Sequence, residues 1–235
     1  MAIFKKIYKI ISYIVVLGCS QHAYLQESKL FLDIDYNTFS HSKLKQFQEE
    51  FVQDLEPVNV KTVDNFPANV GFTLGYEFVN IKTAIYFSYN TTGGKISYGD
   101  YSGQIRILQP VTGYSIGGIY HIDLIKESPS KLKLGLKSIN TFSFFEIDNY
   151  SKFNNTTTEE SYKFSSRDIG LGSFLLFEQP VSIFSLRIKA GYDYVFGGKL
   201  IFSENKEAYL ENNRGSAVRT NWSGIRTGLG IAYTF

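Results

Sequence analysis

Two groups of residues have the types and spacing of catalytic side chains. Residues 113–117, Gly-Tyr-Ser-Ile-Gly, match the G-x-S-x-G pattern in which a serine acts as a nucleophile. That pattern needs a strand, a sharp turn and a helix, with a histidine later in the chain. Here the residues after Gly117 continue an extended pattern, and His121 lies about 20 Å from Ser115 in a strand that rises about 3.3 Å per residue. The match therefore does not predict a serine nucleophile.

The second group is His121 and Asp123, which share one strand face and lie about 7 Å apart. Such a pair can be an acid–base site or a hydrogen-bonded pair inside the fold, and we interpret it as the latter. The chain has three histidines, His22, His41 and His121, and one cysteine, Cys19, so it does not supply a metal-ligand cluster. It has neither a P-loop nor a G-x-G-x-x-G motif. We therefore expect no cofactor and no enzymatic activity.

The elements that position these side chains are predicted from alternation, which is clearest in residues 222–235. One face of this stretch is apolar and ends in two aromatics; it carries Ile225, Thr227, Leu229, Ile231, Tyr233 and Phe235. The other face carries three glycines, an alanine, a threonine and Arg226. Large apolar side chains on one face and small or polar ones on the other are typical of a membrane β-barrel strand with a narrow interior.

Seven more strands and one helix are predicted along the chain. The strands cover residues 29–39, 70–78, 81–89, 104–124, 132–145, 162–177 and 183–196, with the last at 219–235. Residues 42–55 change to a helical period, with Leu44, Phe47, Phe51 and Leu55 on one face. This amphipathic helix can lie on the outer leaflet, cover the barrel mouth or pack beneath its own loop. The fold class is thus an all-β, antiparallel up-and-down transmembrane barrel of about eight strands.

Connection lengths decide how the chain passes Pro110. Outer-membrane barrels alternate short periplasmic turns with long extracellular loops. If the chain does not reverse at Pro110, the short links all fall on one side and the long ones on the other; the long links are then residues 40–69, 91–111, 148–161 and 197–218. Thr91-Thr92-Gly93-Gly94 has turn chemistry. We interpret Pro110 as a bulge or as part of an extracellular extension.

The same alternation assigns a set of charged side chains to the barrel interior. An eight-stranded barrel is only wide enough for its own side chains, so these charges are expected to pair across the interior rather than line an open channel. The predicted interior network is Asp33, Asp35, Glu77, Lys82, His121, Asp123, Lys133, Lys137, Asp168, Arg187, Lys189, Asp193 and Arg226. The outward face carries aromatics near the strand ends, where aromatic girdles meet lipid headgroups.

Over nearly the whole length this pattern resembles the small outer-membrane barrels of the protein A and protein X kind. The final strand resembles the C-terminal assembly signal of such barrels, carried here by Leu229, Ile231, Tyr233 and Phe235. Three loop stretches are similar to motifs of uncharacterised Gram-negative barrels: residues 65–67, 91–95 and 100–103. The resemblance implies the outer membrane as the location, outer-membrane lipid and the barrel-assembly machinery as partners, and no catalytic residues.

The N-terminus has the pattern of a secretory signal. Lys5, Lys6 and Lys9 precede a short apolar run, residues 10–18, that is too short for a stable membrane helix. We expect residues 1–20 to be a signal peptide and residues 21–235 to be one barrel domain. The alternative is lipidation at Cys19, because residues 16–19 resemble a lipobox.

Charge and pattern together give a ranked set of functions. Without the three N-terminal lysines, 21 basic residues face 22 acidic ones, so no nucleic-acid partner is expected. The first hypothesis is a monomeric barrel with a plugged interior and long outer loops, with a structural, adhesive or ligand-binding role at the cell surface. The alternatives are a narrow pore for small solutes, then an outer-membrane lipid-modifying enzyme, then a soluble lipocalin-like carrier.

Overall fold

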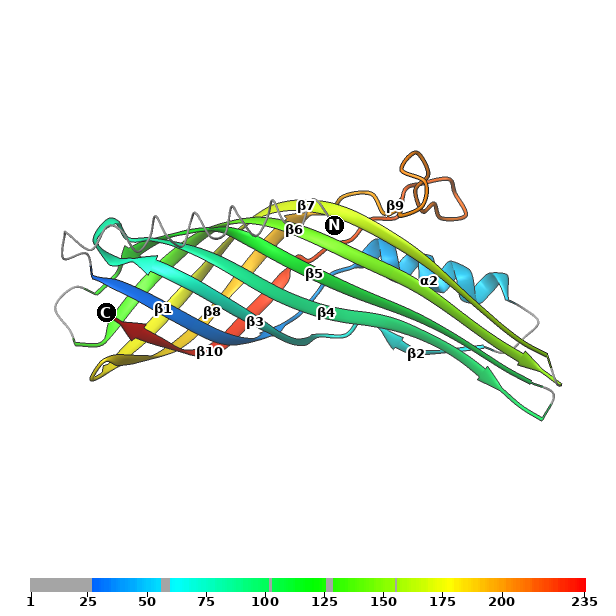
Figure 1. Ribbon diagram of the computed structural model, residues 1–235, viewed down its shortest axis with the longest axis horizontal. Helices are drawn as coiled ribbons and strands as arrows, with labels where there is room; N and C mark the ends of the chain where they lie inside the picture. Colours follow the sequence, from blue (N-terminus) through cyan, green and yellow to red (C-terminus); the bar gives the residue numbers. More distant parts are fainter. Residues whose placement is uncertain (1–26, 56–59, 102, 126–128, 155) are drawn as a thin grey trace, which may run out of the picture.

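A computed structural model describes residues 27–55, 60–101, 103–125, 129–154 and 156–235, so the predicted signal peptide and Cys19 lie outside the described residues. Eight antiparallel strands close into a ring in which each strand pairs with the next and the last pairs with the first (Figure 1). They are β1 (Ser28–Asn37), β3 (Asn69–Phe78), β4 (Thr83–Gly99), β5 (Gly103–Asp123), β6 (Lys131–Phe153), β7 (Thr156–Val181), β8 (Phe184–Phe196) and β10 (Gly224–Thr234). The predicted up-and-down barrel is confirmed.

Strict alternation turns one face of each strand inward. In β1, Leu30, Leu32 and Ile34 are about half exposed on the outside, whereas Asp33 and Asp35 are buried inside. Glycines on the inner face make room for these long side chains. Gly230 lies directly across from Asp33, and a methyl group on Gly230 would overlap the Asp33 carboxylate. The run of glycines in β10 thus reflects crowding in the interior.

The two ends of the barrel differ in their connections. At one end the start of β1 meets the C-terminus, where the Ser28 N–H donates to the Phe235 carbonyl at 3.2 Å. Strands at this end are joined by a single 3₁₀ turn, η1 (Val79–Ile81), and by a tight turn at residues 182–183. Short connections mark the periplasmic end, so the longer ones at the opposite end are extracellular. Among the described residues, no helix is long and apolar enough to cross a bilayer.

Four neighbouring strands continue well beyond the barrel on the extracellular side. β4, β5, β6 and β7 have 17, 21, 23 and 26 residues, whereas β1, β3, β8 and β10 have 10 to 13. They form a curved sheet, the extracellular sheet, which extends to the right in Figure 1. The predicted loops 91–111 and 148–161 were therefore wrong, because most of their residues are paired strand.

Pro110 lies inside this extension. It faces Gly93 in an unbroken register between β4 and β5, and the β5–β6 register has the same offset on both sides of it. The chain does not reverse at Pro110, as predicted, and the bulge interpretation is wrong. Gly93 and Gly94 form no turn because both flanking strands, β5 and the short β2 (Lys61–Asn65), pair with this part of β4.

The extracellular sheet has its own apolar core. The predicted helix is present as α2 (Ser42–Asp54), and it lies along the extracellular sheet beyond the barrel (Figure 1). Leu44 packs in a buried cluster with Phe66, Ile96, Ile107 and Phe145, and Phe47, Phe51 and Leu55 pack against it. The helical stripe therefore packs beneath its own loop and covers the inner face of the sheet, while β2 was not predicted.

The final strand starts later than predicted, at Gly224 rather than at residue 219. The preceding residues turn into the extracellular mouth of the barrel, where Thr220 and Trp222 are buried. Residues 197–218 hold only the two-residue strand β9 (Ile201–Phe202), which pairs with β7, and isolated bridges.

Candidate functional site: the barrel interior

Ion pairs fill the periplasmic end of the interior. Glu77 on β3 accepts from Lys133 on β6 at 2.7 Å and contacts His121 Nδ1 on β5 at 3.1 Å. Glu178 on β7 pairs with Lys133 at 3.1 Å and with Lys29 on β1. All of these side chains are at most 5% exposed. Five strands are thus tied together by one buried cluster.

An aromatic layer lies next to this cluster. Phe31 and Phe174 are buried in the interior, each directly across from a glycine, Gly75 and Gly135. A methyl group on either glycine would overlap the facing ring. The guanidinium of Arg187 stacks over the Phe31 ring at 4.2 Å. The interior is therefore not uniformly polar, and this apolar layer does not belong to the predicted charge network.

Two further ion-pair groups occupy the middle of the barrel. Asp33 accepts from Arg187 at 3.0 Å and from Lys189 at 2.8 Å, and Lys189 also lies 2.9 Å from Asp35. The Thr73 hydroxyl donates to Asp35 at 2.6 Å. These contacts join β1, β3 and β8.

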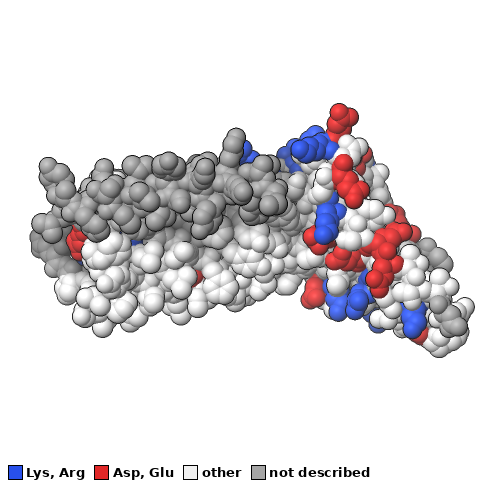
Figure 2. Space-filling model, in the orientation of Figure 1, with Lys and Arg blue, Asp and Glu red and all other residues white. Residues whose placement is uncertain are grey.

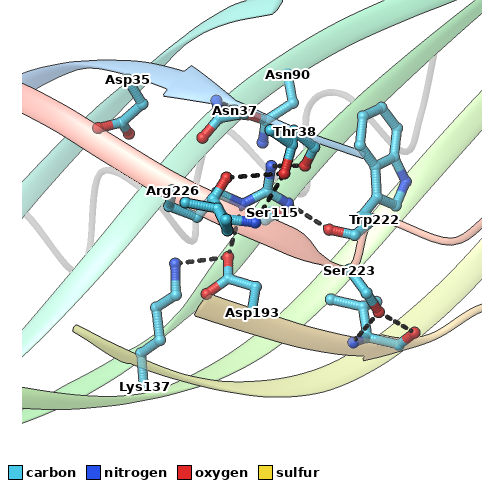
Figure 3. Close-up of polar contacts among 12 residues, drawn as sticks. Asp35, Asn37, Thr38, Asn90, Ser115, Lys137, Asp193, Trp222, Ser223 and Arg226 are labelled. Carbon is cyan, nitrogen blue, oxygen red and sulfur yellow. Dashed lines mark hydrogen bonds and ion pairs between the residues drawn. The ribbon is translucent and has the colours of Figure 1, made fainter. Parts of the chain in front are cut away.

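The second group centres on Asp193 of β8 (Figure 3). It pairs with Lys137 at 2.8 Å and with Arg226 Nε at 3.0 Å. Arg226 also donates to the backbone carbonyls of Thr38 and Trp222. Arg226 of β10 is thus joined to β8 and to the loop segments at Thr38 and Trp222, toward the extracellular end of the interior.

Asp168 departs from the expectation of paired charges. Its carboxylate is fully buried and accepts from Ser143 at 2.6 Å, from Thr220 at 2.8 Å and from the Gly198 N–H at 2.6 Å. Ser166 contributes a further hydrogen bond. Hydroxyl and amide donors thus take the place of a basic partner, as they do at carboxylates that accept several hydrogen bonds.

Lys82 and Asp123 correct a second expectation. They form an ion pair at 2.7 Å, but their side chains are 45% and 28% exposed at the periplasmic mouth. The hydrogen bond to the Asp123 carboxylate raises the pKa of Lys82 above its usual value. This pair lies at the rim because η1 and the end of β5 reach beyond the ring, so it does not belong to the interior network.

The catalytic patterns of the sequence do not form catalytic geometry. Ser115 shares a hydrogen bond of 2.7 Å with Thr141, whereas His121 contacts Glu77 at the periplasmic end. β5 runs through the G-x-S-x-G residues without a turn. Within the described part of the chain, no three His, Cys, Asp or Glu side chains gather where they could hold a metal ion.

Little empty space remains between these side chains. The central cavity, lined by Asp33, Tyr86, Lys137 and Arg226 among others, has a volume of about 40 Å³, and a second one beside Trp222 has about 20 Å³. A water molecule needs at least about 10–15 Å³ measured in this way. The middle of the interior therefore has room for a few water molecules. At the periplasmic mouth there is a larger cavity of about 250 Å³, lined by Glu77, His121 and Lys133 among others.

The predicted interior set lacks Lys29 and Glu178, which form a buried ion pair. Both follow the parity of their strands, since Lys29 is four residues before Asp33 and Glu178 is ten residues after Asp168. Phe39, His41, Phe66 and Trp222, called the extracellular plug below, could not be predicted from strand parity because they lie outside the strands. There, Trp222 donates to Ser143 at 2.8 Å, and the ring of His41 packs against Phe39, Phe66 and Trp222.

The barrel exterior has the opposite character to its interior. Leu229, Ile231 and Tyr233 on the outside of β10, and Phe235 directly after it, are 41–64% exposed. In Figure 2 the visible barrel surface is almost free of charged atoms, and Lys, Arg, Asp and Glu gather where the extracellular sheet leaves the barrel. An apolar belt around a closed ring with paired charges inside suits hydrocarbon outside and polar groups within. The protein is a small outer-membrane β-barrel.

Comparisons with known proteins find structures of similar shape only. No family model matches the chain, and no curated protein does. Neisserial surface protein A matches with 15% identity and a TM-score of 0.39, covering 88% of this chain and 97% of that one. A major outer membrane protein from Thermus thermophilus matches with 12% identity and a TM-score of 0.47 over 88% and 99%. Outer membrane protein OprG from Pseudomonas aeruginosa has 12% identity and a TM-score of 0.43 over 89% and 96%.

Proposed function

We propose that this barrel is a closed support that holds the extracellular sheet rigidly above the outer membrane for binding a partner at the cell surface. The supporting observation is the contrast between the two parts. The middle of the interior is filled by paired charges and aromatic rings and leaves cavities of about 40 and 20 Å³, and the larger cavity of about 250 Å³ is confined to the periplasmic mouth. Four strands, in contrast, continue outward over their own apolar core.

The outer tip of the sheet is the best candidate for the contact surface. Tyr101, between β4 and β5, is fully exposed, and Phe153 at the end of β6 is 44% exposed. Exposed aromatic side chains on a rigid frame are typical centres of binding interfaces, because they bury a large area at a small cost in conformational entropy. The extracellular partner is therefore expected to contact these two rings.

The test is binding of labelled, barrel-bearing vesicles to host cells and to extracellular matrix proteins. The double variant Tyr101→Ser, Phe153→Ser is expected to reduce binding at least tenfold. The matched control is Tyr209→Ser, which removes an exposed aromatic from the segment between β8 and β10. Equal binding by the wild type and the tip variant would exclude the tip as the contact surface.

A narrow pore is the second candidate, favoured by the polar cavities around Lys137 and Arg226. Planar-bilayer recordings distinguish the two. We expect no stable current from the wild type, and we expect Arg226→Ala to produce brief openings because it removes the side chain that joins Asp193 to the Trp222 carbonyl. Steady single-channel steps from the wild type would favour the pore.

We propose no catalytic role for the interior, since its carboxylates are already occupied by close donors such as Lys133, Arg187 and Thr220. An assay for phospholipid hydrolysis by the folded protein tests this, and turnover that Asp168→Asn abolishes would overturn it.

We also propose that the protein is a monomer and that Leu229, Ile231, Tyr233 and Phe235 direct assembly. Deletion of Phe235 is then expected to lower the amount of folded protein in the outer membrane.

A further inference from the structure

Three cations lie together on the outside of the barrel, just above its apolar belt. They are Arg167 on β7, Lys199 after β8 and Arg219 before β10, and all three side chains are exposed. Arg167 is on the same face of β7 as Ile169 and Leu171, which are 59% and 68% exposed to the lipid side. The three cations are called the collar site below.

The backbone holds the collar site in a fixed arrangement. Lys199 and Arg219 are paired in an antiparallel bridge, and Arg219 Nη1 donates to the Gly197 carbonyl at 3.0 Å. Gly198 packs so closely on the Arg167 backbone that a methyl group there would overlap the Arg167 carbonyl oxygen. The Gly198 N–H also donates to buried Asp168. Positive charge from three separate segments is thus held on one small surface.

None of the three cations forms an ion pair with a carboxylate among the described residues. Arg167 donates to the Asn140 amide oxygen at 3.1 Å and lies 5.6 Å from the centre of the Phe142 ring. Lys199 lies over the Tyr209 ring at 4.4 Å. Asp168, the next residue after Arg167, points inward and is fully buried. The nearby carboxylate of Glu211 accepts a hydrogen bond from the Tyr209 hydroxyl rather than pairing with one of the three cations, so the collar site keeps a net positive charge.

Aromatic side chains border the collar site, one level with Arg167 and others on its membrane side. Phe142 is the cross-strand neighbour of Arg167, and Phe196 is the cross-strand neighbour of Ile169. Tyr194 packs against Phe196 edge to face at 4.9 Å. Aromatic residues in barrels lie at the level of the lipid headgroups. The collar site is thus placed beside the headgroups of the outer leaflet, and it faces sideways toward lipid.

We propose that the collar site binds the phosphate-bearing headgroup of an outer-leaflet lipid. Two guanidinium groups can each donate two parallel hydrogen bonds to phosphate oxygens, and the lysine adds a third cation. The acyl chains of the same lipid can then lie against Phe142, Tyr194 and Phe196. A lipid is favoured over a soluble anion because these apolar rings lie next to the cations on the lipid-facing surface, where they can contact acyl chains.

The test is binding of a diphosphorylated glycolipid to the full-length folded protein in neutral detergent, followed by native mass spectrometry. The variant combines Arg167→Gln, Lys199→Gln and Arg219→Gln, and it is expected to weaken lipid binding at least tenfold. The matched control combines Lys163→Gln, Lys206→Gln and Arg214→Gln, which removes the same charge from exposed extracellular positions. We expect the control to bind within twofold of the wild type.

Two further arms decide the source of the phosphate. Inorganic pyrophosphate is expected to bind at least a hundredfold more weakly than the glycolipid. Phosphatidylcholine is expected to bind more weakly than the glycolipid too, because its single phosphate is balanced by its own quaternary ammonium group. Binding of pyrophosphate as tightly as lipid would overturn the assignment to a lipid. Equal loss in the control variant, or no loss in the collar variant, would overturn the site. Heat-modifiable migration on gels shows that each variant is folded.

Discussion

The part of β5 inside the barrel and the part in the extracellular sheet turn opposite kinds of side chain inward, although they belong to one continuous strand. Within the barrel, Ser115 and His121 face inward, whereas Ile116 and Tyr120 face outward and are more than half exposed. Beyond the barrel, Ile107 faces inward and is buried, whereas Arg106 faces outward. The side-chain period is unchanged, so only the surroundings differ. Lipid outside requires apolar outward faces, and water outside requires the usual apolar core.

This difference implies that the two parts are stabilised by different interactions. The barrel interior depends on charge pairs that cannot lose one partner without leaving the other buried and unpaired. The extracellular sheet depends on contacts between apolar side chains, as in a soluble protein. Substitutions that remove either a buried charge pair or an apolar contact are therefore expected to destabilise the barrel and the extracellular sheet separately.

The largest effect is expected from Glu77→Gln. It removes the carboxylate that Lys133 and His121 share at positions that are at most 5% exposed, so that Lys133 keeps only Glu178 and His121 loses its acidic partner. Removing one partner of a buried pair costs about 3–5 kcal/mol. Urea titration of the folded protein in detergent, followed by gel migration, measures the loss. The control is Glu146→Gln, whose partner Lys163 is 3.7 Å away and exposed, and a loss of the same size there would contradict the account.

A smaller and local effect is expected from Leu44→Ala. Leu44 is completely buried between α2 and the extracellular sheet, so its truncation costs about 3 kcal/mol through lost contacts and a cavity. The barrel should keep its urea midpoint while α2 becomes sensitive to protease. Val63→Ala, at an exposed position in β2, is the control. Unfolding of the barrel together with α2 would show that the two parts are one cooperative unit.

The pH dependence of the extracellular plug is expected to come from His41. Burial, with nearby Arg226 and Lys45, lowers the pKa of His41 to about 3. The unfolded chain binds a proton near pH 6.5 and the folded one does not, so stability falls as the pH decreases between these two values. From pH 7 to pH 5 the loss is about 2 kcal/mol.

Protease resistance of the extracellular end, measured across this pH range, checks the effect. His41→Asn is the matched variant, because Asn tolerates the left-handed backbone of this residue and its amide oxygen can still accept from the Asn221 N–H. The variant should lose the pH dependence between pH 7 and pH 5. An unchanged slope would assign the effect to another group.

The smallest effect is expected from Lys82→Gln. The Lys82–Asp123 pair lies at the periplasmic mouth in contact with water, and solvent-exposed ion pairs contribute little to stability because water and salt screen them. The urea midpoint is expected to stay within experimental error of the wild type. A loss comparable to that of Glu77→Gln would mean that the mouth belongs to the interior network after all.

Much of the fold is predictable from residue parity because a membrane strand must keep one face apolar. The ring of strands, α2 and the unbroken path past Pro110 follow from it. The strands of the extracellular sheet do not have the pattern of membrane strands, because they carry glycines and polar residues and because their apolar side chains face inward instead of outward. The pattern therefore predicted loops there. Ile96, Ile107 and Ile147 nevertheless keep the alternation, which was the available signal.

The interior was predictable only as a list of side chains and not as pairs. Parity points Asp33, Glu77 and Arg187 inward, but partners come from the barrel register, which joins residues more than 40 positions apart. The aromatic layer has a register signal too, since Phe31 and Phe174 each face a glycine on the neighbouring strand. That signal becomes visible only after strand pairing is known.

The outward face of β5 passes from lipid to water between Ile116 and Arg106. Spin labels at Ile116→Cys and Arg106→Cys, in a background without Cys19, measure this directly by their collision rates with oxygen and with a water-soluble nickel complex. The label at position 116 should collide mainly with oxygen and the label at position 106 mainly with nickel. A label at position 116 that is as accessible to nickel as the one at position 106 would contradict the account.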